Sequence, residues 1–468
     1  MAALFCRTVN TTDTIAAITT APGEAGIAVI RVSGKEALAI ADAVFRGSGE
    51  APSARSANTF VHGYVHPPKQ SESDAADIDE VILLTYRAPH SYTREDVVEF
   101  QGHGGATSAR RILRTLLDAG ARLAEPGEFT RRAFLSGRID LLQAEAVMDL
   151  IRARSDRAAV AAVEQLEGSL SRSFTDVYDR LIAVAADLEA TLDFGEDELP
   201  AATMATLRNQ LDAVKADLEE LVATWDEGHL LREGATVVIS GRPNVGKSTL
   251  LNALLGADRA IVTHQPGTTR DVLEEQLVLD GIPLRLIDTA GLRNADCDIE
   301  QEGIRRAHSQ ITSADINLCV IDGSETISDS ERKHISVRDA EGCIVVMNKC
   351  DLGRRATDAD FPELTTITCS LRDGVGVEEL RQAISDKIGV TQSAPSHATI
   401  SERHRLIVQC ALNELNDVSR LLASDQDEFA VVAAGMIRTA LEQLGEVTGR
   451  TYHAELLDNV FDRFCVGK

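Results

Sequence analysis

The sequence predicts a multidomain protein of α/β and α architecture, in which one α/β domain is inserted into a discontinuous helical domain that follows an N-terminal α/β domain. Three observations predict this arrangement. The segment from Gly241 to Ser248 stands between an apolar strand and a helix, residues 234–392 alternate strands with helices, and long helical patterns flank that region. We therefore expect four parts, at residues 1–137, 138–233, 234–392 and 393–468.

Composition limits the classes of function. The chain has 468 residues and a formal net charge of −26, from 73 acidic and 47 basic residues. A free-standing nucleic-acid binder usually has the opposite balance, so contact with nucleic acid needs a local basic patch or a partner. The eight cysteines form no Cys-x-x-Cys pair, and no apolar run approaches the ~18 residues of a transmembrane helix. We therefore expect a cytoplasmic protein with no membrane contact.

The N-terminal part has the pattern of an α/β domain. Apolar runs predict strands at residues 14–18, 26–32, 80–86 and 96–100. Helices are expected at residues 35–45 and 106–119, with a loop at residues 49–58. The segment Gln101-Gly-His-Gly-Gly105 is compatible with a ligand pocket and equally with a plain strand-to-helix turn.

Two long amphipathic helices are predicted between residues 138 and 233. One carries a heptad seam of alternating four- and three-residue spacing, formed by Leu207, Leu211, Val214, Leu218, Leu221 and Trp225. A similar stripe on the preceding helix consists of Leu166, Leu170, Phe174, Leu181, Leu188 and Leu192. Such a seam needs a partner helix, and a helical pattern resumes after residue 400 with Leu406, Val408, Leu412 and Leu415. The helical domain is therefore expected to be built from both sides of residues 234–392.

The inserted part predicts a doubly wound sheet that binds a ligand at the carboxyl ends of its strands. Strands are expected at residues 237–240, 275–279, 284–288, 316–321, 343–348 and 366–370. Gly241-Arg-Pro-Asn-Val-Gly-Lys-Ser248 is a phosphate-binding P-loop in its required strand-to-helix context. Its glycines let backbone N–H groups approach an anion. We expect Lys247 to pair with the β- and γ-phosphates and the Ser248 hydroxyl to ligate Mg²⁺.

Further segments follow in the order of a Ras-like GTPase domain. Thr268 and Thr269 precede the second strand, where one hydroxyl can complete the Mg²⁺ shell, and Asp288-Thr-Ala-Gly291 ends a strand near the expected γ-phosphate. Asn348-Lys-Cys-Asp351 ends another strand, and the Asp351 carboxylate can accept both donors of the guanine edge. Ser370 begins the loop expected to support the base. The predicted ligand is therefore GTP.

The residues expected to hydrolyse GTP depart from the usual GTPase pattern. Leu292 follows the Asp-x-x-Gly motif, where many GTPases have a glutamine that orients the attacking water. Leucine has no donor or acceptor, so either hydrolysis is slow or another group, such as a carboxylate of residues 293–303, positions the water. Asn244 offers a side-chain carbonyl that can hold a monovalent cation in place of an arginine finger.

Taken with its flanking segments, the chain resembles the MnmE (TrmE) family of tRNA-modification GTPases over nearly its full length. The matching segments include residues 26–34, Glu99-Phe-Gln-Gly-His-Gly-Gly105, Glu125-Pro-Gly-Glu-Phe-Thr-Arg-Arg-Ala-Phe-Leu135, residues 230–234, 241–248, 266–271 and 288–293, and Phe464-Cys-Val-Gly-Lys468. The resemblance implies a K⁺-activated GTPase that, with the flavoprotein MnmG (GidA), adds an aminomethyl or carboxymethylaminomethyl group to carbon five of the wobble uridine of certain tRNAs. It implies a homodimer formed through the N-terminal domain, a heterotetramer with MnmG, and FAD on that partner alone.

The resemblance also implies roles for individual residues. It implies a 5,10-methylenetetrahydrofolate site (5-formyltetrahydrofolate-like) in the N-terminal domain, with contacts from Arg31, Glu99, Arg138 and Lys468. The implied K⁺ contacts are Asn244, Thr263, Gln265 and Thr268, and the implied Mg²⁺ contacts are Ser248 and Thr269. The catalytic residues would be Glu300, Lys247 and Cys465. The expected GTP contacts are Asn244, Val245, Gly246, Lys247, Ser248, Thr249, Thr263, His264, Gln265, Pro266, Gly267, Thr268, Thr269, Asp288, Thr289, Ala290, Gly291, Asn348, Lys349, Asp351 and Ser370.

Some positions depart from the family pattern. Arg138 stands where the family often has lysine, and Leu371 stands where alanine is usual. His264-Gln265-Pro266 replaces small or aliphatic residues, and the proline is expected to stiffen the K⁺ loop. From the residues alone a packing role is favoured for Cys465, whereas the resemblance implies a role in modification.

A second function from another class is a GTP-dependent assembly or signalling switch that acts on the ribosome or RNA without modification chemistry of its own. Ribosome-associated GTPases share the central motifs. Arg31, Glu99 and Cys465 discriminate between the two functions, because a pure switch has no use for a folate pocket.

Overall fold

The computed structural model describes residues 13–68, 76–193, 201–257, 274–288, 314–328, 331–332, 335, 342–389, 399–423 and 428–468. By its internal contacts the chain divides into two compact units. One consists of Met1–Met148, Leu166–Val214 and Cys410–Lys468, and the other of Asp149–Gln165 and Lys215–Gln409. The four-part division predicted from the sequence is finer than this one and stays a prediction.

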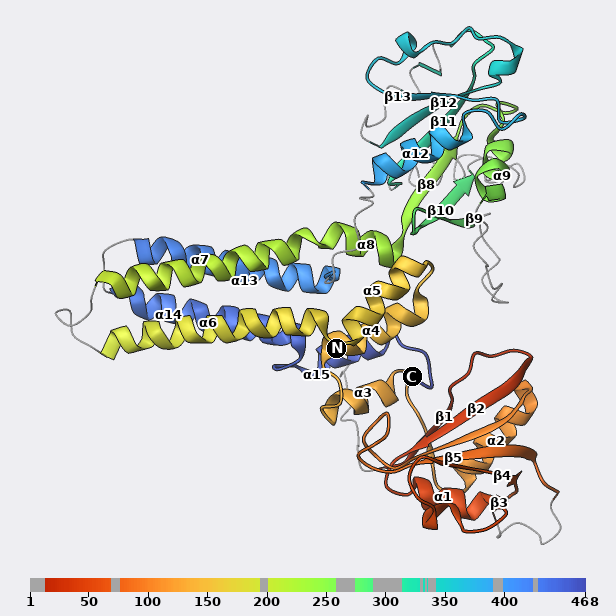
Figure 1. Cartoon of the computed structure of the whole chain (residues 1–468), viewed down its shortest axis with the longest axis vertical. Coiled ribbons are helices and arrows are strands. Elements are labelled where there is room, and N and C mark those ends of the chain that lie inside the picture. Colours follow the sequence, from red (N-terminus) through yellow and green to blue (C-terminus); the bar gives the residue numbers. More distant parts are fainter. Residues whose placement is uncertain are drawn as a thin grey trace, which may run out of the picture. The chain divides into compact units, whose positions relative to one another are not determined.

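The first unit contains a seven-stranded sheet of order β3-β4-β5-β6-β2-β1-β7 (Figure 1). Its strands are β1 (Ile15–Ile18), β2 (Ala25–Ser33), β3 (Phe45–Gly47), β4 (Thr59–Val65), β5 (Asp79–Tyr86), β6 (Val97–Gly104) and β7 (Arg122–Leu123). Neighbouring strands are antiparallel, except that β1 and β7 run parallel. α1 (Ala37–Val44) and α2 (Ala106–Asp118) pack against one face, where Val32, Phe100 and Ile112 belong to one apolar core.

The strands and helices predicted for this region are confirmed, but β3, β4 and the two-residue β7 are missing from the prediction. Phe45 begins a strand instead of ending the first helix, and the predicted loop contains a short 3₁₀ turn, Pro52–Ala54. β4 carries His62 and Gly63, which break the apolar alternation that marks a strand. Gly63 is needed because a Cβ there would lie 2.4 Å from the Phe45 ring.

The Gly-His-Gly-Gly segment is largely part of the sheet. β6 continues through Gly104, and Gly105 is the N-cap of α2. A Cβ on Gly102 would lie 2.8 Å from the Asp79 carboxylate, which accepts hydrogen bonds from the backbone N–H of His103 at 3.0 Å and from its ring Nδ1 at 2.7 Å. These glycines therefore serve close packing at the end of the sheet.

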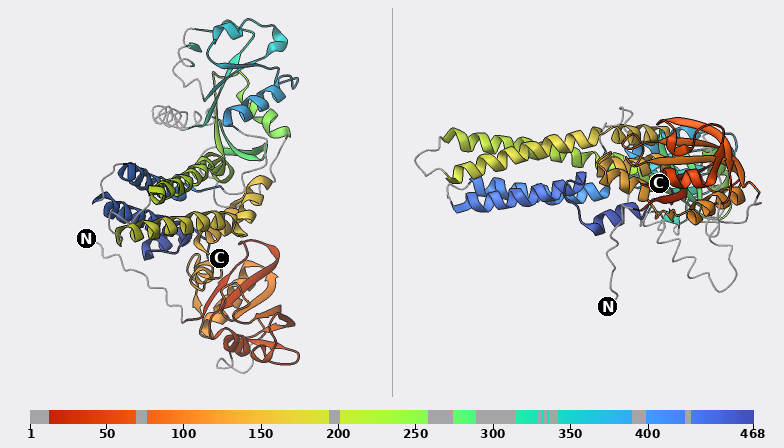
Figure 2. Two further views of the ribbon diagram at one scale, coloured as in Figure 1. Left: turned by 60° about the vertical axis from the view of Figure 1, so that its left-hand side comes forward. Right: turned by 90° about the horizontal axis from the view of Figure 1, so that it is seen from below.

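The helices that lie between the two sheets in the sequence, and those that follow the second sheet, come from both sides of the inserted region, as predicted (Figure 1, Figure 2). They are α3 (Glu128–Leu135), α4 (Leu141–Arg152), α5 (Asp156–Leu166), α6 (Ser169–Asp193), α7 (Ala201–Ala223), α8 (Trp225–Glu233), α13 (Glu402–Ala423), α14 (Glu428–Thr448) and α15 (Ala454–Phe461). α14 packs along α6, where Arg438 and Glu189 form an ion pair at 2.7 Å. Arg208 of α7 donates to the carbonyl oxygen of Leu422 in α13.

The heptad seam is confirmed on α7, where Leu207, Leu211, Val214, Leu218 and Leu221 are buried. Three members of the predicted stripes lie elsewhere. Trp225 begins α8 after α7 has ended, and Leu166 ends α5 instead of belonging to α6. Leu406 is 53% exposed, whereas Val408, Leu412 and Leu415 are buried.

The second unit contains a six-stranded sheet of order β13-β12-β11-β8-β10-β9. Its strands are β8 (Ala235–Ser240), β9 (Glu274–Leu279), β10 (Ile282–Asp288), β11 (Ile316–Asp322), β12 (Cys343–Asn348) and β13 (Thr365–Thr368). Only β9 is antiparallel to its neighbour among these described strands. Apolar residues of the sheet pack with α9 (Lys247–Ala257) and α12 (Val377–Ile388) in one core.

The six strands predicted for residues 234–392 are confirmed, with ends within two residues of those expected. Because β8, β10, β11 and β12 are parallel, their last residues Ser240, Asp288, Asp322 and Asn348 stand at one edge of the sheet. The loops that follow therefore start at that edge, where an open parallel sheet binds its ligand. In the described part of the chain, no helix has the length and apolar character needed to cross a membrane.

Candidate functional site

The loop between β8 and α9 has a backbone shape that glycine makes possible. Gly241 has φ +148°, and a Cβ there would lie 2.2 Å from the carbonyl oxygen of Val320. Gly246 has φ +108°, and a Cβ there would lie 2.3 Å from Nδ2 of Asn348. Asn244 also has a left-handed backbone, with φ +63°. The loop thus turns back on itself at three points, which is the kind of concave backbone that holds phosphate groups.

Lys247 begins α9 and is almost fully buried, with 7% exposure. Its ammonium donates hydrogen bonds to two loop carbonyl oxygens, of Arg242 at 2.7 Å and Gly241 at 3.1 Å. The first backbone bond of the helix runs from the Leu250 N–H to the Gly246 carbonyl at 2.9 Å. The N–H groups before Leu250 therefore lie at the positive end of the helix, and Ser248 and Thr249 are exposed beside them.

The loop after β12 is tied directly to the P-loop. Nδ2 of Asn348 donates to the carbonyl oxygen of Val245 at 2.8 Å, and its Oδ1 accepts from the Leu371 N–H at 3.1 Å. The Ser370 hydroxyl donates to the Asp351 carboxylate at 3.0 Å. Three predicted segments, which are far apart in the sequence, therefore converge at one edge of the sheet.

Asp322 is a member of this edge that sequence reasoning missed. It ends β11, and its carboxylate accepts a hydrogen bond from the Lys349 ammonium at 2.6 Å. Burial acts to raise the pKa of Asp322, but the hydrogen bonds from Lys349 and Ser324 hold that pKa below its usual range. Lys349 has φ +66°, so this ion pair fixes an unusual backbone in the middle of the predicted guanine motif. The signal for Asp322 is a carboxylate at the end of a buried apolar run.

Several predicted nucleotide contacts lie outside the described residues. They are Thr263, His264, Gln265, Pro266, Gly267, Thr268, Thr269, Thr289, Ala290 and Gly291. Leu292 and the predicted catalytic residue Glu300 also lie outside the described residues. Asp288 is placed by its backbone at the end of β10, on the same edge as the P-loop.

The donor groups at this edge can be compared with what Mg²⁺ requires. The described residues contain no cluster of three or more His, Cys, Asp or Glu side chains that could hold a metal ion. Ser248 offers one hydroxyl at the helix start, so Mg²⁺ would be held there together with phosphate oxygens, as it is in nucleotide sites. The described residues fit a Mg²⁺–nucleotide complex better than a metal held by the protein alone.

A second group of candidate functional residues lies on the first unit and is called the N-terminal constellation here. Nε of Arg31 donates to the Glu99 carboxylate at 2.7 Å, between the neighbouring strands β2 and β6. The guanidinium of Arg31 lies 5.2 Å from the ring centre of Tyr92 and 5.5 Å from that of Phe129. Arg138 lies 4.9 Å from the same Tyr92 ring. Two residues predicted as folate contacts, Arg31 and Arg138, thus meet at Tyr92, and a third, Glu99, joins them through Arg31.

Residues 465–468 bond to the backbone on either side of Glu128, next to Phe129. The Phe129 N–H donates to the carbonyl oxygen of Lys468 at 3.2 Å, and the Gly127 N–H to that of Cys465 at 3.4 Å. Gly467 has φ +100°, and a Cβ there would lie 2.4 Å from the carbonyl oxygen of Ile18. The tail is therefore fitted closely against the sheet, and Cys465 is exposed on it.

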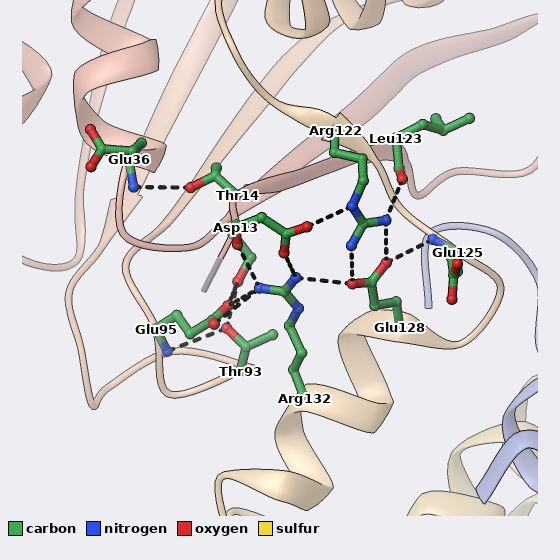
Figure 3. Close-up of polar contacts among 11 residues, drawn as sticks. Asp13, Thr14, Glu36, Thr93, Glu95, Arg122, Leu123, Glu125, Glu128 and Arg132 are labelled. Carbon is green, nitrogen blue, oxygen red and sulfur yellow. Dashed lines mark hydrogen bonds and ion pairs between the residues drawn. The ribbon is translucent and has the colours of Figure 1, made fainter. Parts of the chain in front are cut away.

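A buried ion-pair network supports the start of α3 (Figure 3). Glu128 and Arg132 are only 1% and 2% exposed, and their side chains meet at 2.9 Å. Arg122 donates to Glu128 at 2.6 Å and to Asp13 at 2.7 Å, and Arg132 donates to Asp13 at 2.7 Å. Burial acts to raise the pKa values of Glu128 and Asp13, but the arginine hydrogen bonds hold both below their usual range. The network fixes the segment that carries Phe129.

The aromatic members of this constellation are absent from the sequence prediction. Tyr92 lies in the connection between β5 and β6, where no motif distinguishes it. Phe129 stands inside the Glu-Pro-Gly-Glu-Phe-Thr segment, so that segment was the available signal. The carboxylate, guanidinium and aromatic groups can recognise a flat heterocycle that carries hydrogen-bond donors.

The chain is similar to known proteins over nearly its full length. The chain matches two family models, "GTP-binding protein TrmE N-terminus" over residues 14–138 and "MnmE helical domain" over residues 141–465. A relative from Geobacter sulfurreducens, named tRNA modification GTPase MnmE, is 44% identical over 97% of this chain and 99% of its own length. A relative of the same name from Moorella thermoacetica is 43% identical over 97% and 99%. A solved G domain of the T. maritima FeoB iron transporter is 25% identical over 33% of this chain and 98% of that chain, with a TM-score of 0.25, which supports no argument about fold. Its similarity to these relatives and family models shows that the chain belongs to the MnmE family of tRNA modification GTPases.

Proposed function

We propose that this protein hydrolyses GTP and, with a flavoprotein of the MnmG kind, takes part in adding an aminomethyl or carboxymethylaminomethyl group to carbon five of the wobble uridine of certain tRNAs. The observation that carries the proposal is the hydrogen bond from Asn348 to the carbonyl oxygen of Val245. It joins the loop suited to phosphates to the loop suited to guanine, so that one nucleotide can contact both.

The roles of the nucleotide-binding residues follow from their chemistry. Lys247 would turn from the loop carbonyls to the β- and γ-phosphates, and Asp351 would accept from the guanine edge. Ser248 and Thr269 would hold Mg²⁺, which supplies neutralisation of phosphate charge when it is bound. Glu300 would orient the attacking water, a task that Leu292 cannot perform.

The proposed K⁺ site centres on Asn244. Its left-handed backbone and exposed side chain support this role, because the amide oxygen is free of the packing that fixes Val245. Thr263, Gln265 and Thr268 would supply the other oxygen ligands. Hydrolysis by the full-length protein is expected to be much faster in K⁺ than in Na⁺, and Asn244→Ala should remove that difference. Equal rates of the unaltered protein in the two salts would remove the case for a K⁺ site.

The Arg31–Glu99–Tyr92–Arg138 constellation is proposed to bind a tetrahydrofolate that carries the one-carbon unit. The carboxylate of Glu99 suits the donor edge of a pterin, and the aromatic rings of Tyr92 and Phe129 suit its flat face. Lys468 and Arg138 add positive charge for the anionic tail of the folate. Cys465, exposed on the adjoining tail, is proposed to act in the modification.

The open face of the N-terminal sheet supports a homodimer. Ile27, Phe60, Tyr64 and Ile82 are 58%, 76%, 38% and 44% exposed, and they stand on β2, β4 and β5. Large exposed apolar side chains gathered on one sheet face usually mark an interaction site. A second copy of the chain is the proposed occupant.

Nucleoside analysis of tRNA tests the proposal. Cells that lack this protein should have wobble uridines without the group at carbon five, and the intact gene should restore it. A Lys247→Ala gene should fail to restore it. Unchanged wobble uridines in the deletion strain would overturn the proposed modification role and leave a GTP-dependent switch.

A further inference from the structure

The outer side of α2, the helix that packs against the N-terminal sheet, is basic. Arg110, Arg111 and Arg114 are exposed there, and Asp118 is the only acidic residue of the helix. These three arginines are called the basic face of α2. The face stands out because the chain as a whole has a formal net charge of −26.

The charges of α2 are placed against its helix dipole. The first turn contains no acidic residue and the last turn no basic one, whereas all three arginines precede Asp118. Acidic side chains stabilise the start of a helix and basic side chains its end. The arginines therefore do not stabilise the helix itself, and together with the positive end of the dipole they make this side of the domain attractive to anions.

Two of the arginines have no partner in the described part of the chain. Nε of Arg110 donates to the Ala106 carbonyl oxygen of its own helix at 3.1 Å. Arg111 and Arg114 form no hydrogen bond or ion pair with any described residue. They line a groove of about 400 Å³ together with Pro67, Pro68, Ile78, Thr115 and Asp118. Both guanidinium groups are therefore open to an anionic ligand.

The chemistry of α2 favours phosphates over a membrane or a protein surface. Its apolar side, with Ala109, Ile112 and Leu116, is buried in the domain core, so no apolar face of the helix is left to enter a membrane. The exposed large apolar side chains of the described chain all lie outside α2, and a protein partner usually needs such anchors. Guanidinium groups bind phosphates through paired hydrogen bonds. An RNA strand presents phosphates in a row, which matches a row of arginines.

The basic face stays open when the other proposed partners bind. α1 and α2 cover the sheet face on which Val32 and Val61 are buried. Because successive side chains of a strand point to opposite faces, Arg31 and Phe60 lie on the other face. That other face carries the proposed folate site and the proposed homodimer surface. A polyanion on α2 therefore displaces neither of them.

We propose that the basic face of α2 binds the phosphate backbone of RNA, with Arg111 and Arg114 on phosphates of one strand and Arg110 beside them. The choice of tRNA as this RNA rests on the proposed function, whereas phosphate binding rests on the arginines alone. Since α2 and the proposed folate site lie on opposite faces of the sheet, the contact anchors the body of the tRNA. It does not reach the uridine that is modified.

Binding of tRNA to the full-length protein at a series of salt concentrations, measured by fluorescence anisotropy, tests the proposal. The double variant Arg111→Gln/Arg114→Gln should weaken tRNA binding about tenfold, because it removes two charged donors. The slope of log affinity against log salt concentration should fall in magnitude by about 2, since each phosphate contact contributes about one. A tRNA that is modified and one that is not should lose affinity equally, because phosphate contacts do not read sequence.

A matched control separates the position of the charges from their number. Arg420→Gln/Arg438→Gln removes the same total charge from α13 and α14, where the two side chains are 78% and 68% exposed. It should leave the tRNA affinity and the salt slope unchanged. Both double variants should keep the unfolding temperature of the unaltered protein, because all four side chains are on the surface.

Three results would overturn the inference. The first is equal loss of tRNA affinity in the two double variants, which would make total charge the cause. The second is unchanged tRNA affinity and salt slope in the α2 variant, also if that variant loses a protein partner instead. The third is no tRNA binding by the unaltered protein. Unchanged wobble uridines in cells that lack the protein would refute the proposed function alone, because RNA binding is measured on the purified protein.

Discussion

The two proposed ligand sites are built in opposite ways. The nucleotide site is shaped by backbone, from eight consecutive residues whose glycines at 241 and 246 have no space for a Cβ. The N-terminal constellation is shaped by side chains, because Arg31, Tyr92, Glu99 and Arg138 come from separate elements and meet through ring and carboxylate contacts. Adding atoms to the P-loop should therefore weaken nucleotide binding, and removing charges should weaken binding at the N-terminal site.

The largest effect is expected for the buried network beneath the N-terminal constellation. Arg132→Met leaves Glu128 and Asp13 with Arg122 as their remaining arginine partner and removes the fully buried one, and it should lower the free energy of unfolding by about 3 kcal/mol. Hydrogen exchange of β1 and β2 amides, with urea unfolding, measures this loss. Arg46→Met is the control, because Arg46 pairs with Asp77 while 65% exposed, and it should cost about 1 kcal/mol or less. Equal effects of the two variants would show that the network gives no special stability.

Adding one methyl group to the P-loop tests the other half of the comparison. Gly246→Ala forces a Cβ toward Asn348 on a strained backbone, so GTP affinity should fall about 100-fold, as measured with a fluorescent nucleotide. Gly256→Ala, in open space on α9, should leave GTP affinity unchanged. Folate affinity should be the same in both variants. A loss of folate affinity in Gly246→Ala would contradict the separate construction of the two sites.

Removing one charge from the N-terminal constellation is the converse change. Glu99→Gln breaks the pair with Arg31 and should weaken tetrahydrofolate binding about tenfold, while GTP affinity stays constant. Glu80→Gln is the matched control, because Glu80 belongs to β5 and is 50% exposed beside His62. If both variants bound folate like the unaltered protein, Arg31 and Glu99 would not form the folate site.

The smallest effect is expected from acid. Acid should lower the stability of the network beneath the N-terminal constellation and should not act on the nucleotide site. The pKa of Glu128 is lower in the folded protein than its ordinary value of 4.5, so the unfolded state binds more protons at low pH. The stability from Glu128 is then fully present above pH 4.5 and is lost as pH falls through the folded pKa. Urea unfolding between neutral and acidic pH should show this loss, and Glu128→Gln should flatten the curve. An unchanged slope in that variant would assign the acid sensitivity to other carboxylates.

The same contrast explains what the sequence could predict. The P-loop and the six strands around it were predictable, because their signals lie in consecutive residues. Tyr92 was not, because its role depends on Arg31 and Arg138, which approach it only in the folded sheet. β4 was missed because Gly63 leaves space for the Phe45 ring of the neighbouring strand β3. The sequence of β4 alone does not show that this ring lies there.

The docked tail has a consequence for biosynthesis. A ribosome releases the N-terminal sheet long before it makes residues 465–468, and domains generally fold in that order. Yet the N–H groups of Gly127 and Phe129 bond to the carbonyl oxygens of Cys465 and Lys468. The N-terminal sheet therefore waits for residues 465–468 before the proposed site beside it is complete, so a product truncated before residue 465 would carry a folded sheet with an unfinished site.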